Sequence, residues 1–348
     1  MKPAPSEASV PADSDDERLV GDIVGSDATA RRRAIGRAIT LFESTRADHR
    51  RRADALLTAL PAPATATWRI GVSGVPGVGK STFIETLGLL MIGDGHRVAV
   101  LAIDPSSSVS GGSILGDKTR MDRLSVHERA FVRPSPSRGT LGGVAAATRE
   151  AIRVVEAAGY DAVIVETVGV GQSESAVAAM TDLFVLLQLP NAGDELQAIK
   201  KGVMELADLV VVNKADLDPA AAARAVGQLR MAVQLAGRRA GDGAPPPVMA
   251  TSATEAERVA EVWQAIRSWR ASASAGDGIA ARRRAQGRAW LWERIDAGLR
   301  DDFRSHAAVR GALPGALREV DAGVLAPSVA ARRLLDLFSP EASAAAGP

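Results

Sequence analysis

Cysteine is absent from this chain of 348 residues, and aromatic residues make up only 3% of it. Without cysteine, disulfides, thiolate metal sites and a cysteine nucleophile are excluded, and the composition fits a reducing cytoplasm. Hydrophobic residues nevertheless reach 46%, which is enough for a domain of ~200 residues with helical additions. The scarcity of aromatic rings predicts a core built mainly of Ala, Val, Leu and Ile.

Excess charge of one sign and long apolar runs are also absent. The 42 Lys and Arg residues nearly balance the 41 Asp and Glu residues, so no global field attracts nucleic acid or an anionic membrane. The longest apolar runs, such as Val98–Ile103 and Leu183–Leu187, are far shorter than the ~18 residues of a membrane span. Met1–Glu17 lacks the apolar stretch of a signal peptide. We therefore expect a cytoplasmic protein with neither membrane nor nucleic acid as a partner.

The sequence divides into four segments. Residues 1–16 are rich in Pro, Ala, Ser and Asp and are expected to form a disordered tail. Residues 17–66 are expected to form an N-terminal helical extension, because apolar residues between Asp27 and Leu60 recur at helical spacing. Residues 67–270 have the pattern of an α/β domain, and residues 271–348 that of a C-terminal helical arm.

Within the C-terminal segment, a Ser, Ala and Gly-rich stretch at Ala271–Gly278 resembles a linker. Ala281–Phe303 and Pro327–Phe338 have helical patterns on either side of a stretch at Gly311–Gly315 that Gly and Pro interrupt. Two helices with a break between them are therefore expected there.

Six short apolar runs alternate with helical stretches in the α/β segment. They are Arg69–Ser73, Val98–Asp104, Ala162–Glu166, Leu183–Leu189, Leu209–Asn213 and Pro247–Thr251. Strands that alternate with helices indicate a parallel sheet with crossover helices. The sequence therefore predicts an α/β fold with a doubly wound, mostly parallel sheet of the P-loop NTPase class.

The first predicted strand leads into a phosphate-binding motif. Gly74–Ser81 fills every fixed position of the GxxxxGK[ST] pattern, in which glycines let successive N–H groups face phosphate at a helix N-terminus. Lys80 is expected to neutralise the β- and γ-phosphates, and the Ser81 hydroxyl to bind Mg²⁺. The predicted phosphate-binding residues are Gly74, Val75, Pro76, Gly77, Val78, Gly79, Lys80, Ser81 and Thr82.

A second motif selects the base. Asn213-Lys214-Ala215-Asp216 follows an apolar strand, which places it at the carboxyl edge of the sheet, where nucleotides bind. The Asp216 carboxylate accepts hydrogen bonds from N1–H and N2–H of guanine, and adenine offers no such pair. Ser252-Ala253-Thr254 resembles the short loop that supports the guanine O6 through a backbone amide. The combination predicts GTP and GDP as ligands.

Acidic residues at strand ends complete the predicted site. Glu166-Thr167-Val168-Gly169 has an acid and a glycine three apart, as in a Walker B and switch II segment. Glu166 would lie near Mg²⁺, and the Gly169 amide would contact the γ-phosphate. Asp104 and Asp117 are further candidates to bind the metal or the attacking water. The alternative for each is an acidic loop residue without a catalytic role.

Two sets of site residues follow from these motifs. The predicted catalytic residues are Lys80, Asp104, Glu166 and Gly169. The predicted Mg²⁺ ligands are Ser81, Asp104, Asp117 and Glu166. No residue identifies itself as the hydrolytic base, because nothing in the sequence places Gln172 or Glu174 on the attacking water. We therefore expect slow intrinsic turnover that a partner accelerates.

Three strings closely resemble the MeaB/ArgK family of methylmalonyl-CoA mutase-associated GTPases. They are Asp104–Ser107, Glu166–Glu174 and Asp194–Gly202, and the resemblance extends from about Ala30 to Phe338. It implies a homodimeric GTPase whose C-terminal helices form a dimerisation arm. It also implies a chaperone that gates cofactor loading of adenosylcobalamin-dependent methylmalonyl-CoA mutase, or a related B12-dependent acyl-CoA mutase, and protects or reactivates it.

The family resemblance also has implications for the switch and for the cofactors. It implies that Gly169–Glu174 is a switch that relays the nucleotide state to the mutase. Related GTPases that insert nickel or cobalt carry Cys and His clusters, whereas this chain has no cysteine and only four scattered histidines. The cobalamin-binding Asp-x-His-x-x-Gly string is absent too. The chain is therefore expected to bind no cobalamin itself.

Two other classes of protein remain as alternatives. One is a P-loop kinase or ATPase linked to basic amino-acid transport, against which the Asn213–Asp216 motif argues. The other is a GTPase that binds nucleic acid through Arg31–Arg33, Arg50–Arg52 and Arg282–Arg284, but these runs lack interleaved aromatic residues.

Overall fold

A computed structural model of the chain describes residues 14–103, 121–133, 141–167, 173–190, 201–235 and 245–338. The chain forms two compact units, Met1–Ile279 and Ala280–Pro348, and each is described by itself. Among the residues within these described ranges, no helix combines the length and the apolar character needed to cross a membrane.

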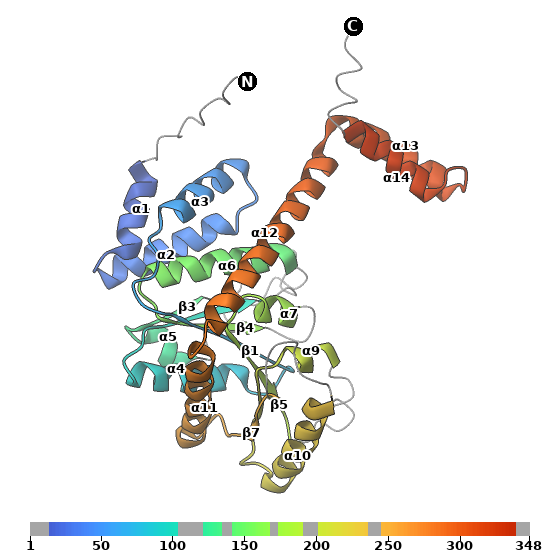
Figure 1. Cartoon of the computed structure of the whole chain (residues 1–348). Helices are drawn as coiled ribbons and strands as arrows, with labels where there is room; N and C mark the ends of the chain where they lie inside the picture. Colours follow the sequence, from blue (N-terminus) through green and yellow to red (C-terminus); the bar gives the residue numbers. More distant parts are fainter. Residues whose placement is uncertain are drawn as a thin grey trace. The chain divides into compact units, whose positions relative to one another are not determined.

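A seven-stranded sheet forms the centre of the first unit (Figure 1). Its strands are β1 Trp68–Gly74, β2 Val98–Ile103, β3 Ala130–Arg133, β4 Ala162–Thr167, β5 Leu183–Gln188, β6 Leu209–Val212 and β7 Val248–Ala250. Their order is β3-β2-β4-β1-β5-β6-β7, and every neighbouring pair is parallel. The α/β prediction is confirmed, and all six predicted strands are present.

The seventh strand, β3, was not expected. It has only four residues and lies at an edge of the sheet next to β2. Such a short run carries almost no periodicity, so its pairing with β2 decides its conformation rather than its own pattern. The structure therefore adds one strand to the six that the sequence predicted.

Both faces of the sheet are covered, which explains why the strands are almost continuously apolar. Alternate strand side chains contribute to two separate cores, such as Val163 and Val165 to one and Ile164 to the other. The helices on the first face are α6 Leu141–Ala157, α7 Ser173–Ala178, α9 Lys201–Leu206 and α10 Pro219–Leu235. Those on the second are α4 Lys80–Gly93, α5 Asp122–Val126 and α11 Ala256–Ser274.

The N-terminal extension consists of three helices, α1 Ser14–Val24, α2 Ala28–Phe42 and α3 Ala47–Ala59 (Figure 1). The Asp27 carboxylate accepts hydrogen bonds from the Thr29 and Ala30 amides, 2.7 and 2.9 Å away, and so caps α2. The apolar faces of the three helices join the core that also contains α6.

Part of the segment expected to be disordered is helical. Helix α1 begins at Ser14, within the predicted tail of residues 1–16. Three acidic residues in its first turn favour a helix start, because they interact with the positive end of the helix dipole. Asp16 also pairs with Arg52 of α3, with the nitrogen and oxygen 2.6 Å apart. Residues 1–13 lie outside the described residues.

The C-terminal segment contains three helices, where the sequence predicted two, and the last of them has the predicted bounds. They are α12 Gly278–Ser305, α13 Ala307–Asp321 and α14 Pro327–Phe338. The expected linker at Ala271–Gly278 is largely helical, because α11 continues to Ser274 and α12 begins at Gly278. The expected break at Gly311–Gly315 lies inside α13, which contains Pro314. Packing of α13 against α14, with Val309 fully buried, accounts for a helix that accommodates a proline.

Candidate nucleotide-binding site

The loop between β1 and α4 has the backbone of a phosphate-binding loop. Gly77 and Gly79 have φ angles of 80° and 94°, in the left-handed region that favours glycine. Gly79 has a second constraint, since a Cβ there would lie 2.7 Å from the Asn213 amide nitrogen. Helix α4 starts directly at Lys80, so the loop opens onto a helix N-terminus, as a phosphate group requires.

Lys80 is held against this loop. Its Nζ donates hydrogen bonds to the Gly74 and Val75 carbonyls at 2.8 and 3.3 Å, and only 8% of the residue is exposed. An ammonium group positioned at the loop provides a compact charge for phosphate oxygens. The geometry is thus consistent with the predicted role of Lys80.

Two of the four predicted metal ligands lie together. The Ser81 hydroxyl, in the first turn of α4, donates a hydrogen bond to Glu166 Oε1 at 3.3 Å. Glu166 comes from the end of β4 and is almost fully buried. A hydroxyl and a carboxylate are oxygen donors that suit Mg²⁺. The other two, Asp104 and Asp117, lie outside the described residues, as does Gly169.

Asn213 joins the phosphate loop to the loops that are predicted to recognise the base. Its amide nitrogen donates to the Val78 carbonyl at 2.7 Å, and its amide oxygen accepts from the Ala253 amide at 2.9 Å. Asn213 is 1% exposed, so water does not compete for these two bonds. The side chain therefore fixes the spacing between the phosphate end and the base end of the site.

The remaining base-recognition residues are arranged around this bridge. Lys214 has a φ of 59° and is the one residue other than glycine with a positive φ in the described part of the chain. The Ala215 amide donates to the Thr251 carbonyl at 3.0 Å, which holds the two predicted loops side by side. Asp216 is exposed, as a carboxylate that contacts an incoming base must be. Ser252 and Ala253 are buried, whereas Thr254 is exposed.

Two supporting contacts were not predicted from the sequence. The Thr86 hydroxyl donates to the Ala253 carbonyl at 2.7 Å, so α4 also supports the loop of the third motif. The Thr167 hydroxyl donates to Ser73 Oγ at 2.8 Å between the ends of β4 and β1. A polar residue at the end of an apolar strand was the one available signal, and it does not reveal its partner.

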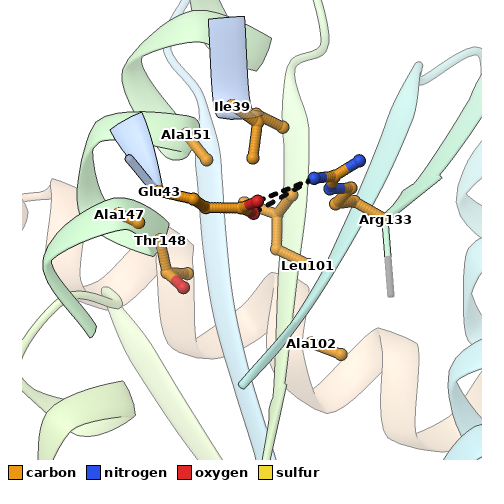
Figure 2. Close-up of a pocket in the computed structure, with 8 residues that line it drawn as sticks. All are labelled: Ile39, Glu43, Leu101, Ala102, Arg133, Ala147, Thr148 and Ala151. Atoms are coloured by element: carbon orange, nitrogen blue, oxygen red, sulfur yellow. Dashed lines mark hydrogen bonds and ion pairs between the residues drawn. The ribbon is translucent and has the colours of Figure 1, made fainter. Parts of the chain in front are cut away.

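A small pocket lies elsewhere in the first unit (Figure 2). Its space is about that of one water molecule. It is lined by Ile39, Glu43, Leu101, Ala102, Arg133, Ala147, Thr148 and Ala151. Figure 2 shows Glu43 facing Arg133, to which it is paired at 3.0 Å. Burial raises the pKa of the Glu43 carboxyl, while the Arg133 guanidinium opposes this rise. The pocket lies between α2, α6 and the strands β2 and β3, and it is too small for a nucleotide.

The sheet, the phosphate loop and the guanine-recognition motif define the class of the protein, a P-loop GTPase. A family model described as "Methylmalonyl Co-A mutase-associated GTPase MeaB" matches residues 35–308. The chain belongs to this family, as its motifs suggested.

Known proteins similar along most of their length support the assignment. A Mycobacterium tuberculosis protein described as "Probable GTPase" is 49% identical over 327 residues, which cover 94% of this chain and 97% of that protein. The mouse "Methylmalonic aciduria type A homolog, mitochondrial" is 43% identical over 333 residues, with coverage of 93% and 80%. A crystal structure of a protein described as a LAO/AO transport system kinase has a TM-score of 0.73 and 34% identity, covering 95% of this chain and 99% of that one. The chain is a GTPase that binds guanine nucleotides.

The Asn213 bridge yields a testable prediction. In Asn213→Ala, the Val78 carbonyl and the Ala253 amide lose their partner, so we expect GDP affinity to fall about 10- to 100-fold. Asn213→Asp should be no better, because a carboxylate would face the Val78 carbonyl. Titration with a fluorescent GDP analogue measures the effect, and the exposed Gln228→Ala on α10 is the control. Affinity within twofold of the unsubstituted chain in Asn213→Ala would contradict the assigned role of the bridge.

Proposed function

We propose that this GTPase is a chaperone of an adenosylcobalamin-dependent methylmalonyl-CoA mutase or a related B12-dependent acyl-CoA mutase. It gates cofactor loading and protects or reactivates the mutase, without binding cobalamin itself. The observation that carries this proposal is the match of residues 35–308 to a family described as mutase-associated. The name of the mouse relative points to the same metabolic context. We further propose that the protein works in the cytoplasm.

The proposed site has separate groups for the phosphates, the metal ion and the base. Lys80 neutralises phosphate charge from its position against the loop carbonyls. Ser81 and Glu166, together with Asp104 and Asp117, hold Mg²⁺, which supplies positive charge to the β- and γ-phosphates when it is bound. The close approach of the Ser81 hydroxyl and the Glu166 carboxylate supports a shared metal site at this point.

The base is held at the opposite end. Asp216 accepts the two guanine N–H groups, and Ser252, Ala253 and Thr254 form the loop beside O6. Asn213 and Lys214 connect this end to the phosphate loop, since Asn213 bonds to Val78 and Lys214 lies beside Gly79. The Gly169 amide contacts the γ-phosphate and thereby distinguishes GTP from GDP.

The exposed carboxylate of Asp216 yields a prediction about the base. Asp216→Asn should lower GTP affinity about 100-fold, because a carboxamide accepts only one of the two guanine N–H bonds. The same variant should gain affinity for xanthosine triphosphate, whose 2-carbonyl accepts the new N–H group. Competition binding with GTP, ATP and xanthosine triphosphate measures both effects.

This competition assay also tests the alternative of a kinase or ATPase linked to basic amino-acid transport, the class to which the name of one similar structure refers. In the unsubstituted chain, ATP should compete poorly with GTP. Equal competition by ATP would remove guanine specificity, and with it the proposed role of Asp216.

We also propose a homodimer that forms through the C-terminal helices. Large apolar side chains are exposed on one face of α12, at helical spacing. They are Leu291, Trp292, Ile295 and Leu299. A stripe of this kind on a helix without buried residues favours a second copy as its partner.

The α12 stripe predicts the effect of charge on assembly. The double substitution Trp292→Glu with Leu299→Glu should convert a particle of twice the chain mass to a monomer of 36.1 kDa, measured by light scattering. Ala297→Glu, on the opposite side of α12, is the matched control and should remain dimeric. A monomeric unsubstituted chain at about 10 µM, well above the dissociation constant of a stable interface, would refute the dimer.

A mutase should stimulate GTP hydrolysis, because the switch lacks an evident hydrolytic base and a partner is expected to order it. Co-purification with methylmalonyl-CoA, isobutyryl-CoA and ethylmalonyl-CoA mutases identifies the client. GTP hydrolysis is then measured with each of the three mutases. We expect at least about tenfold stimulation by one of them. Lys80→Ala serves as the inactive control against contaminating GTPases. Equal rates with and without every mutase would argue against the chaperone proposal.

A further inference from the structure

The end of β4 is tied to the phosphate-binding loop on both faces of the sheet. Successive strand residues point to opposite faces, and Glu166 and Thr167 follow this rule. Glu166 Oε1 accepts the hydrogen bond of Ser81 on the side of α4. The Thr167 hydroxyl donates to Ser73 Oγ, 2.8 Å away, on the side of α7.

The contact between Thr167 and Ser73 is fully buried. Thr167 is 0% exposed and Ser73 is 1% exposed. A hydroxyl that loses its partner in such a place is costly, because no water replaces the bond. This hydrogen bond is therefore a durable link between the last residue of β4 and the residue that precedes the phosphate loop glycine.

Strand β1 also contacts helix α7, which follows β4 in the sequence. Gly71 lies two residues before Ser73 and so faces the same side of the sheet. A Cβ on Gly71 would lie 2.7 Å from Val177 Cγ1 and 2.9 Å from Thr181 Oγ1. Helix α7 therefore rests on bare β1 backbone. Both flanks of residues 168–172 are thus held on β1, by Ser73 on one side and Gly71 on the other.

The two contacts at the end of β4 differ in how they respond to ligand. Ser81 and Glu166 are proposed metal ligands, so Mg²⁺ would compete for the two oxygen atoms that here share a hydrogen bond. Thr167 and Ser73 lie on the opposite face of the sheet, away from the metal. Neither residue is a proposed ligand of the metal or the nucleotide, so we expect their hydrogen bond to persist when those ligands bind.

We propose that Thr167 is a positioning residue for GTP hydrolysis, which fixes the end of β4 to Ser73 while Glu166 changes partners. In the reaction, water attacks the γ-phosphorus, the bond from that phosphorus to the bridging oxygen breaks with its electron pair left on GDP, and the proton released by the water passes to phosphate or to solvent. Thr167 transfers no proton in these steps. It holds the strand end, and with it the neighbouring Glu166, at a fixed distance from the phosphate loop, which keeps the Glu166 carboxylate positioned for the reaction.

An isosteric substitution tests this role. Thr167→Val keeps the side-chain volume but removes the hydroxyl, and we expect the single-turnover rate of GTP hydrolysis to fall about tenfold or more. The Kd for GDP should stay within about threefold, because no bond to the nucleotide is removed. Thr167→Ser retains the hydroxyl and should restore the rate. Ser73→Ala should match Thr167→Val, and the double variant should be no slower than either one.

Thr148→Val separates positioning from general destabilisation. Thr148 is also a buried threonine, and its hydroxyl bonds to the Val144 carbonyl within α6, away from the nucleotide. This variant should keep the hydrolysis rate, and its melting temperature, measured beside that of Thr167→Val, gives the effect of losing a buried threonine hydroxyl outside the site. An unchanged rate in Thr167→Val overturns the proposal, and so does a parallel loss of rate and GDP affinity. The assay uses the chain alone, so its failure does not affect the mutase proposal.

Discussion

The proposed nucleotide site depends above all on the buried carboxamide of Asn213. This side chain uses its nitrogen on the phosphate loop and its oxygen on the loop after β7, segments that lie 135 and 40 residues away in the sequence. Gly79 has to be glycine partly because this amide occupies the place of a Cβ. In the proposed site, phosphate recognition and base recognition are thus parts of one hydrogen-bonded unit, which a nucleotide would have to fit at both ends.

The parallel sheet makes this unit possible. In the order of the strands, β1 lies at the centre with β4 on one side and β5 on the other, and β6 and β7 follow. Parallel strands end at a common edge, so the residues after β1, β4, β6 and β7 converge there. Motifs that are far apart in the sequence therefore meet without any long side chain having to reach across.

Much of this arrangement was predictable from the sequence. Gly74–Ser81 and Asn213–Asp216 each follow an apolar run, and that order alone placed them at one edge of a sheet. The short strand β3 escaped prediction because four residues carry too little periodicity, and Pro314 suggests a helix break although packing against α14 stabilises α13. Local pattern fails where tertiary contact decides the conformation.

The hydrogen-bond partners of the side chains could not be predicted from the sequence, for a different reason. That Asn213 bonds to Val78 and Thr167 to Ser73 depends on the register of the strands and on the twist of the sheet, neither of which a single sequence specifies. Ser73 and Thr167 carry no motif of their own. They matter because they stand next to residues that do.

The most direct test of the proposed site is a crystal structure of the chain with Mg²⁺ and a non-hydrolysable GTP analogue. We predict that the Asp216 carboxylate accepts both guanine N–H groups and that the metal lies beside Ser81 and Glu166. The bonds of Asn213 to Val78 and Ala253 should persist in that complex. A base bound away from Asp216, or an Asn213 side chain withdrawn from both loops, would contradict the central role of Asn213 and the assignment of the base site.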